Sequence, residues 1–84
     1  MSGTDDITAR VREILAHVLD VPAERIGPGF SSDEAPEWDS LTHLMLISQL
    51  ESEFGVFFPS QELPQLTSLE RIADAIARQA APGG

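Results

Sequence analysis

The sequence predicts an all-α protein: a bundle of four helices, with a long loop between the first two and a short third helix. Apolar residues recur at helical spacing in three segments, which is the main signal for amphipathic helices. Gly and Pro gather between the first two segments, and no pair of segments shows the alternation expected of adjacent strands. The chain, residues 1–84, is expected to form a single domain, ordered over about 5–79 with a frayed tail over 80–84.

The first helix is expected from Asp5 to Leu19, with Thr4 as its N-cap and acidic residues in the first turn, where the helix dipole favours them. Its apolar residues share one face: Ile7, Val11, Ile14, Leu15 and Val18. A loop is expected from Asp20 to Trp38, because Gly, Pro and Ser are frequent there, and loops of this length are often functional. The residues expected to anchor this loop to the core are Val21, Ile26 and Phe30.

The second helix is expected to begin at Asp39-Ser40 and to run to Phe54, with Gly55 in the left-handed conformation that ends many helices. At about 100° per residue, its core-facing stripe covers roughly 240–340° of the helical wheel when Ser40 is placed at zero. The stripe contains Leu46, Ile47, Leu50 and Phe54. His43 falls inside the stripe, which indicates a partly buried packing role, and Leu44 falls on its border.

Leu41 and Met45 lie outside that stripe, beside Ser40. Either the preceding loop covers these two side chains, or they form a small apolar patch that partner proteins recognise. Ser40 also has two interpretations. Serine is a preferred N-cap, but a helix N-terminus suits a bound phosphate too, because free backbone N–H groups and the dipole favour an anion.

A short third helix is expected from Ser60 to about Leu66, interrupted by Pro64. The fourth is expected from Ser68 to about Gln79, with Thr67 and Glu70 at the spacing of a capping box. Its apolar face comprises Leu69, Ile72, Ala73 and Ile76. One core cluster is expected to contain Ile14, Leu46, Ile47, Leu50, Phe54, Leu69 and Ile72.

The chain is acidic, with a formal net charge of −9 from 14 acidic residues against five arginines and no lysine. No Lys or Arg occurs between Arg25 and Arg71. Nucleic acid and anionic membranes are therefore not expected as partners, whereas basic patches on proteins are. Without cysteine, neither a disulfide nor a thiolate metal site is expected. No apolar run of membrane-spanning length and no signal-peptide pattern is present, so a cytoplasmic location is expected.

The segment Glu37–Leu41, Glu-Trp-Asp-Ser-Leu, resembles the attachment motif of the acyl carrier protein family. The surrounding sequence strengthens this resemblance. Leu50–Gly55 looks like the end of that family's second helix, Pro59 follows at the expected place, and Thr67–Leu69 looks like the opening of its last helix. The resemblance covers the chain from about residue 5 to residue 79.

This resemblance implies the fold of acyl carrier proteins and a specific chemistry. A phosphopantetheinyl transferase, using coenzyme A and a magnesium ion, would join 4'-phosphopantetheine to the Ser40 hydroxyl and so make a phosphoprotein. The thiol of the arm would hold acyl intermediates as thioesters. Ser40 would then be an attachment site and not a catalytic nucleophile. Asp39 would help the transferase dock or position its metal, and the docking face would include Leu41, Met45 and Glu51.

The same resemblance implies further partners: an acyl-loading ligase or acyltransferase, and ketosynthase or condensation-type enzymes. Some positions depart from the family's common pattern. Pro36–Trp38 stands where many members have Leu-Gly, and Thr42, Met45 and Ser52 stand where fatty acid carriers commonly have acids. These departures favour polyketide, lipopeptide or other specialised fatty-acyl biosynthesis over primary fatty acid biosynthesis. An aminoacyl or D-alanyl carrier is the alternative.

Two other classes of function compete with a carrier. A hydrolytic enzyme could use Asp39, Ser40 and His43, but no glycine-flanked nucleophile turn surrounds the serine, and so short a chain has little room for a substrate pocket. A helical interaction module without a prosthetic group would explain the acidity and the apolar patch. We therefore expect a monomeric carrier with no catalytic residue and no metal site of its own.

Overall fold

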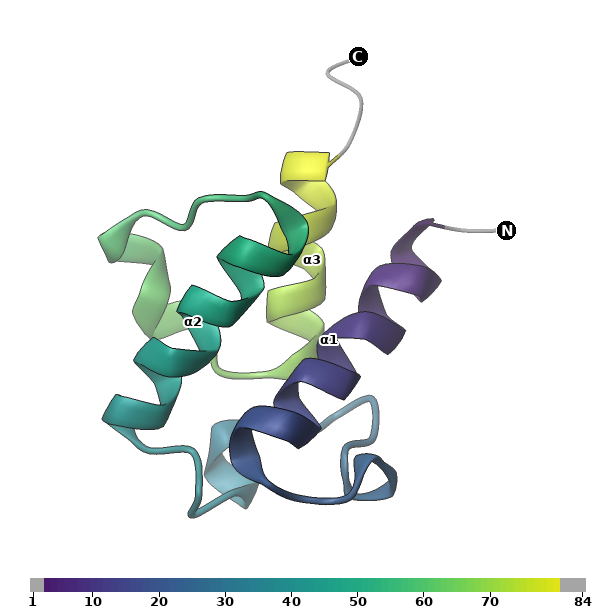
Figure 1. The fold of residues 1–84 in the computed structure, drawn as a ribbon, viewed down its shortest axis with the longest axis vertical. Helices are drawn as coiled ribbons and strands as arrows, with labels where there is room; N and C mark the ends of the chain where they lie inside the picture. Colours follow the sequence, from purple (N-terminus) through teal and green to yellow (C-terminus); the bar gives the residue numbers. More distant parts are fainter. Residues whose placement is uncertain (1–2, 81–84) are drawn as a thin grey trace.

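The computed structural model describes residues 3–80, with side chains described over 6–79. Three α-helices form the bundle: α1 (Gly3–Leu19), α2 (Ser40–Phe54) and α3 (Leu69–Ala80). Three short 3₁₀ helices lie in the connections: η1 (Ala23–Arg25), η2 (Ser32–Glu34) and η3 (Ser60–Gln65). Figure 1 shows α1 packed beside α2 and α3, with η3 next to α2 at the left edge and the connection between α1 and α2 across the bottom. The predicted all-α bundle with a short third helix is confirmed. Of the tail predicted to be frayed, 80–84, residue 80 is the last of α3 and the others lie outside the described residues.

Helix α1 begins at Gly3, two residues before the predicted start at Asp5. Thr4 therefore lies inside the helix, and the prediction that it caps the helix is wrong. Once a helix has formed its first turn, adding residues at its end costs little free energy. The sequence pattern therefore defines the first and last residues of a helix less well than its middle. At the other end Asp20 adopts a left-handed conformation with φ of 58°. The Val21 N–H then donates to the Ala16 carbonyl at 3.0 Å, which is the bond of a Schellman motif.

The connection between α1 and α2 is more regular than predicted, because it contains η1 and η2. Two of its predicted anchors, Ile26 and Phe30, are buried, and the third, Val21, is partly buried against the core. Two further anchors, Ala35 and Trp38, are also buried. The Trp38 indole stacks on the Phe30 ring, with centroids 6.1 Å apart and planes 16° from parallel. The connection is thus held to the core at several points along its length.

Helix α2 turns Leu46, Ile47 and Leu50 into the core, as predicted. Phe54 is partly buried and packs against the core cluster, so its predicted contact with the cluster is confirmed, although it is not one of the cluster's buried residues. It lies in the last turn of α2, next to Gly55. Phe58, four residues later, is a buried member of the cluster. The other six residues of the predicted cluster are in the core: Ile14, Leu46, Ile47, Leu50, Leu69 and Ile72.

The end of α2 agrees with the prediction. Gly55 has a φ of 65°, in the left-handed region that a residue with a Cβ rarely adopts, and its N–H donates to the Glu51 carbonyl at 2.9 Å. The short helix η3 follows and contains Pro64, which has no N–H to donate. This is consistent with a 3₁₀ helix in place of a longer α-helix.

The start of α3 differs from the prediction. Its cap is Ser68, whose Oγ accepts the Arg71 N–H at 3.2 Å, so the predicted capping box of Thr67 and Glu70 is wrong. The reason is tertiary. The Thr67 carbonyl accepts the Ser32 N–H at 2.8 Å, and the Leu69 N–H donates to the Phe30 carbonyl at 3.0 Å. These bonds hold 67–69 extended beside the preceding connection and move the helix start by one residue.

Within the residues that the structure describes, no helix has both the length and the apolar character needed to cross a membrane. The side chains described over 6–79 also contain no cluster of three or more His, Asp or Glu residues that could hold a metal ion.

Candidate functional site

The start of α2 is set by Asp39. Its backbone is extended, and its Oδ1 accepts the Thr42 N–H at 2.9 Å while its carbonyl accepts the His43 N–H at 2.8 Å. Asp39 is therefore the N-cap, and the interpretation of Ser40 as a simple cap is wrong. The hydrogen bond from the Thr42 backbone N–H lowers the pKa of the Asp39 carboxyl below its usual value, because it stabilises the ionised form.

Ser40 is the first residue of α2, and its side chain is exposed. None of the hydrogen bonds found among the described residues uses its Oγ. The positive end of the helix dipole favours an anion at this position. The first turn thus presents an accessible hydroxyl, beside a cap that fixes the backbone and at a place where a phosphate is favoured.

His43 lies one turn after Ser40 and is part-buried, as predicted. Its Nδ1 accepts the Trp38 Nε1–H at 2.9 Å, and its Nε2 lies 2.7 Å from the Leu63 carbonyl oxygen. A nitrogen that accepts carries no proton, so the network assigns a neutral ring whose Nε2–H donates to Leu63. Both ring nitrogens are therefore engaged, and none of the hydrogen bonds in the described part of the chain joins His43 to Ser40. This arrangement is not a hydrolytic triad.

An open hollow of about 350 Å³ lies beside Ser40. Its lining residues come from the start of α2, the connection before it and the segment around the end of η3: Ser32, Trp38, Asp39, Ser40, His43, Pro64 and Thr67. The volume is at the lower end of the range for small-molecule sites. Sequence reasoning missed the contributions of Ser32, Pro64 and Thr67. These residues are distant from Ser40 in the chain, and no local pattern marks them.

Part of the exposed face of α2, in its first two turns, is apolar. Leu41 is 69% exposed, Leu44 57% and Met45 55%, so the preceding connection does not cover them. The interpretation in which that loop buries Leu41 and Met45 is therefore wrong. Leu44, which the helical wheel placed on the border of the core stripe, belongs with the exposed residues. These three residues form what we call the α2 patch, and contiguous exposed apolar side chains of this kind suit recognition by other proteins.

Glu51 lies on the same side of α2 as Ser40 but eleven residues later, about 16 Å along the helix axis. Its Oε2 accepts the Phe58 N–H at 3.0 Å, and the side chain is partly buried. Glu51 therefore holds the segment after α2 in place. Its role in docking stays a prediction.

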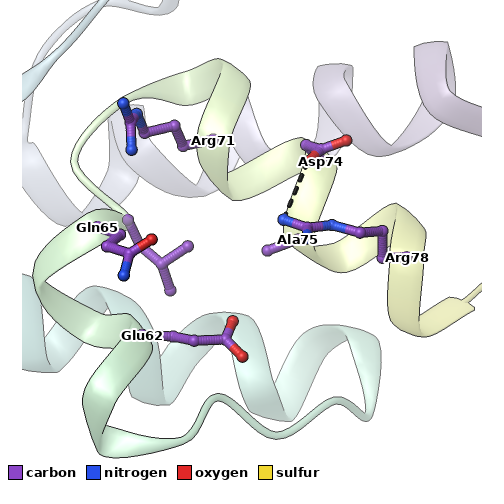
Figure 2. Close-up of a pocket in the computed structure, with 7 residues that line it drawn as sticks. Glu62, Gln65, Arg71, Asp74, Ala75 and Arg78 are labelled. Carbon is purple, nitrogen blue, oxygen red and sulfur yellow. Dashed lines mark ion pairs between the residues drawn. The ribbon is translucent and has the colours of Figure 1, made fainter.

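A second hollow, of about 270 Å³, lies between η3 and α3 (Figure 2). Arg71 and Arg78 extend from α3, and Glu62 projects from η3 on the opposite side. The Arg78 guanidinium pairs with Asp74 at 3.0 Å, which is the contact drawn as a dashed line. This hollow mixes both signs of charge and shares no lining residue with the one beside Ser40. It is a separate feature of the surface.

Comparison with known proteins agrees with this geometry. The family model described as a phosphopantetheine attachment site matches residues 9–76, which include the whole of α2. The acyl carrier protein of Thermosynechococcus vestitus is 36% identical over 76 residues, which cover 90% of this chain and 94% of that protein. The acyl carrier protein of Rubrobacter xylanophilus is 33% identical, with coverage of 86% and 89%, and that of Streptomyces coelicolor is 33% identical, with coverage of 88% and 83%.

Acyl carrier proteins work with a phosphopantetheinyl transferase and with acyl-handling enzymes, and they normally have no catalytic activity of their own. The matches extend over most of the chain and include the accessible serine at the start of α2. The chain therefore belongs to the acyl carrier protein family and contains that family's phosphopantetheine attachment domain.

Proposed function

We propose that Ser40 carries the phosphopantetheine arm and that this protein delivers acyl groups held on the arm's thiol. The observation that carries the proposal is the exposed Ser40 hydroxyl at the first position of α2, outside the hydrogen bonds that hold the helix. Asp39 already caps the helix, so a phosphodiester on Ser40 removes no hydrogen bond that stabilises the start of α2. The helix dipole stabilises the phosphodiester's negative charge at the same place.

The residues around Ser40 fit the arm. The lining of the hollow beside it includes the Ser32 and Thr67 side chains as well as the Trp38 and His43 rings, which suits a chain that carries both amide and methyl groups. When attached, the arm supplies a thiol that forms thioesters. In this proposal the residues around Ser40 hold the start of the arm, and the exposed residues of α2 form the surface to which partner enzymes bind.

The docking face proposed for those partners comprises Asp39, the α2 patch and Glu51. Exposed leucine and methionine side chains gain free energy when a partner buries them. The partners in this proposal are a transferase that uses coenzyme A, a ligase or acyltransferase that loads the acyl group, and ketosynthase or condensation-type enzymes that take it. Residues 5–79 act in this proposal as one carrier domain.

We assign the carrier to specialised acyl biosynthesis of the polyketide or lipopeptide kind, on the composition of α2. The first turn of α2 contains no acidic residue, and Thr42, Met45 and Ser52 stand where carriers of fatty acid synthesis commonly have acids. A partner for this helix would therefore rely more on apolar contact and less on charge near the attachment site. Comparison of loading rates by transferases and ketosynthases from the two kinds of pathway tests this assignment.

The attachment itself is tested by intact-mass measurement after incubation with coenzyme A and a broad-specificity phosphopantetheinyl transferase. The native protein should gain one phosphopantetheine, and Ser40→Ala should gain none while keeping its helical circular dichroism spectrum. Ser48→Ala is the matched control, since Ser48 is also exposed on α2, and it should be modified like the native protein. Modification of Ser40→Ala, or none of the native protein, would show that the assignment is wrong.

A further inference from the structure

Two aromatic side chains bridge the seam between α2 and η3, next to Ser40. The Trp38 Nε1–H donates to His43 Nδ1 at 2.9 Å, and His43 Nε2 is 2.7 Å from the Leu63 carbonyl oxygen. We call this chain of two hydrogen bonds the indole–imidazole bridge. It joins the end of the α1–α2 connection, the first turn of α2 and η3, which are the elements that surround the hollow beside Ser40.

Trp38 is the buried residue in the lining of that hollow. It is 6% exposed, whereas the other lining residues are partly buried or exposed. Behind the indole lies the Phe30 ring, which is stacked on it and is itself buried. A chain that entered the bundle from Ser40 through this hollow would therefore meet an indole that is hydrogen-bonded at its edge and backed by a core side chain.

The core beyond the bridge is filled by side chains. Leu46 and Leu50 of α2 and Leu66 after η3 are buried. Protein interiors are close-packed, so an additional apolar chain would have to displace such residues. Displacing Trp38 or His43 would also leave the indole N–H of the buried tryptophan, or the carbonyl of the partly buried Leu63, without its partner, which is unfavourable.

We infer that the indole–imidazole bridge of Trp38 and His43 keeps the acyl group out of the bundle, so that this carrier holds its cargo at the surface. The inference rests on the proposed attachment at Ser40. It also limits the class of cargo. A long alkyl chain left in water is unfavourable, so the natural cargo is a short or polar acyl group, which favours the polyketide kind of pathway over the lipopeptide kind.

The test compares an acetyl with a dodecanoyl group, each attached with its arm from the corresponding coenzyme A thioester by a broad-specificity transferase. The native protein should melt within about 2 °C for the two cargoes, a difference that corresponds to almost no burial of the longer chain. Its tryptophan emission should also be the same for both, and Trp38 is the only tryptophan of the chain. A melting temperature that rises with chain length in the native protein, together with a shift in Trp38 emission, would overturn the inference.

Variants show whether the bridge is responsible. His43→Leu removes both hydrogen bonds, and its melting temperature should rise by about 4 °C or more from acetyl to dodecanoyl as the chain enters the opened seam. His43→Gln keeps a donor and an acceptor. Its melting temperature should therefore depend less on the length of the acyl chain than that of His43→Leu, as in the native protein. Equal length dependence in the native protein and His43→Leu would contradict the role given to His43. Should His43→Leu fail to fold, Trp38→Phe keeps the aromatic stack, loses the indole N–H and should give the same length dependence.

A measurement on the unmodified protein separates this inference from the proposed function. The indole N–H of Trp38 should exchange slowly with solvent in the native protein and faster in His43→Leu, as followed by nuclear magnetic resonance. Rapid exchange in the native protein would mean that the bridge is open and would overturn the inference. A protein with a protected indole that accepts no arm would instead contradict the attachment at Ser40.

Discussion

Large apolar residues occur on both the buried and the exposed face of α2, but they have different environments. Leu46, Ile47 and Leu50 are buried against the rest of the bundle, whereas Leu41, Leu44 and Met45 are more than half exposed. Leucine occurs on both faces, so side-chain chemistry alone does not decide which face is covered. The position of each residue relative to the elements packed on α2, α1 among them, decides it. The comparison shows that in so small a domain an apolar residue can serve stability or recognition, according to the element that lies over it.

The largest expected effect comes from the same substitution made on each face. Leu50→Ala removes a fully buried side chain and should lower the free energy of unfolding by about 2–5 kcal/mol. Leu44→Ala, at a residue that is 57% exposed, should change it by no more than about 0.5 kcal/mol. Urea unfolding followed by circular dichroism measures both. A chain of this length has roughly 4–12 kcal/mol of stability in total, so the first variant loses a large part of it. Similar losses of stability in the two variants would contradict the conclusion that Leu50 stabilises the fold and Leu44 does not.

The next effect concerns recognition. Leu41→Ala should lower the kcat/KM of transferase modification by about 5- to 20-fold at every salt concentration, because a partner that buries the leucine gains roughly 1–2 kcal/mol from it after the cost of ordering. The control is Phe57→Ala. Leu41 and Phe57 are both 69% exposed, but Phe57 lies beyond the end of α2, away from Ser40 along the helix. Equal effects of the two substitutions would mean that the α2 patch is not the docking surface.

A smaller effect is expected from charge at Glu51, and the structure determines how to test it. Glu51→Gln removes the charge but keeps an oxygen that can accept the Phe58 N–H. It should slow modification about twofold at low salt and not at all at high salt, because screening shortens the range of charge to about 8–10 Å. Glu51→Lys removes the acceptor as well. A defect of Glu51→Lys that salt does not relieve, next to a normal Glu51→Gln, would assign the residue to structure and not to steering.

The smallest effect concerns the pH dependence of stability that Asp39, the N-cap of α2, contributes. The pKa of Asp39 is lowered in the folded protein, so the carboxylate stabilises the fold above the ordinary aspartate pKa of about 4, and this contribution is lost as the pH falls through the lower, folded-state value. Asn is an equally preferred cap that carries no charge. The difference in melting temperature between the native protein and Asp39→Asn should therefore shrink as the pH is lowered from about 7 to about 2. A difference that stays constant would show that the charge contributes nothing.

Local patterns predicted the parts of this molecule that depend on local rules. Helical periodicity found the buried stripe of α2, the left-handed preference of glycine marked its end at Gly55, and the apolar residues Ile26 and Phe30 marked the anchors of the long connection. The motif around Ser40 located the start of the helix. These features depend on neighbours a few residues away, which the sequence displays directly.

The start of α1 at Gly3 is a local difference from the prediction. The other main features that the sequence did not predict depend on contacts between distant segments. Ser68 is the cap of α3 because residues 67–69 form backbone hydrogen bonds with the connection between α1 and α2. Phe58 is a buried member of the core cluster although it lies beyond Gly55, outside the helical pattern that marks the buried residues of α2. The bond from His43 to Leu63 joins residues twenty positions apart. No helical wheel contains that information.

The capping residue of α2 and the serine proposed to carry the arm are different residues, and this has a consequence for partner enzymes. The oxygen that holds α2 in place belongs to Asp39, and the neighbouring Ser40 oxygen holds nothing. Under the proposed attachment, a group added to or removed from that serine should therefore leave the hydrogen bonds of the helix start unchanged. The forms without the arm, with the arm and with an acyl group should then present the same α2 surface. A partner enzyme that distinguishes these forms would have to contact the arm or the acyl group itself.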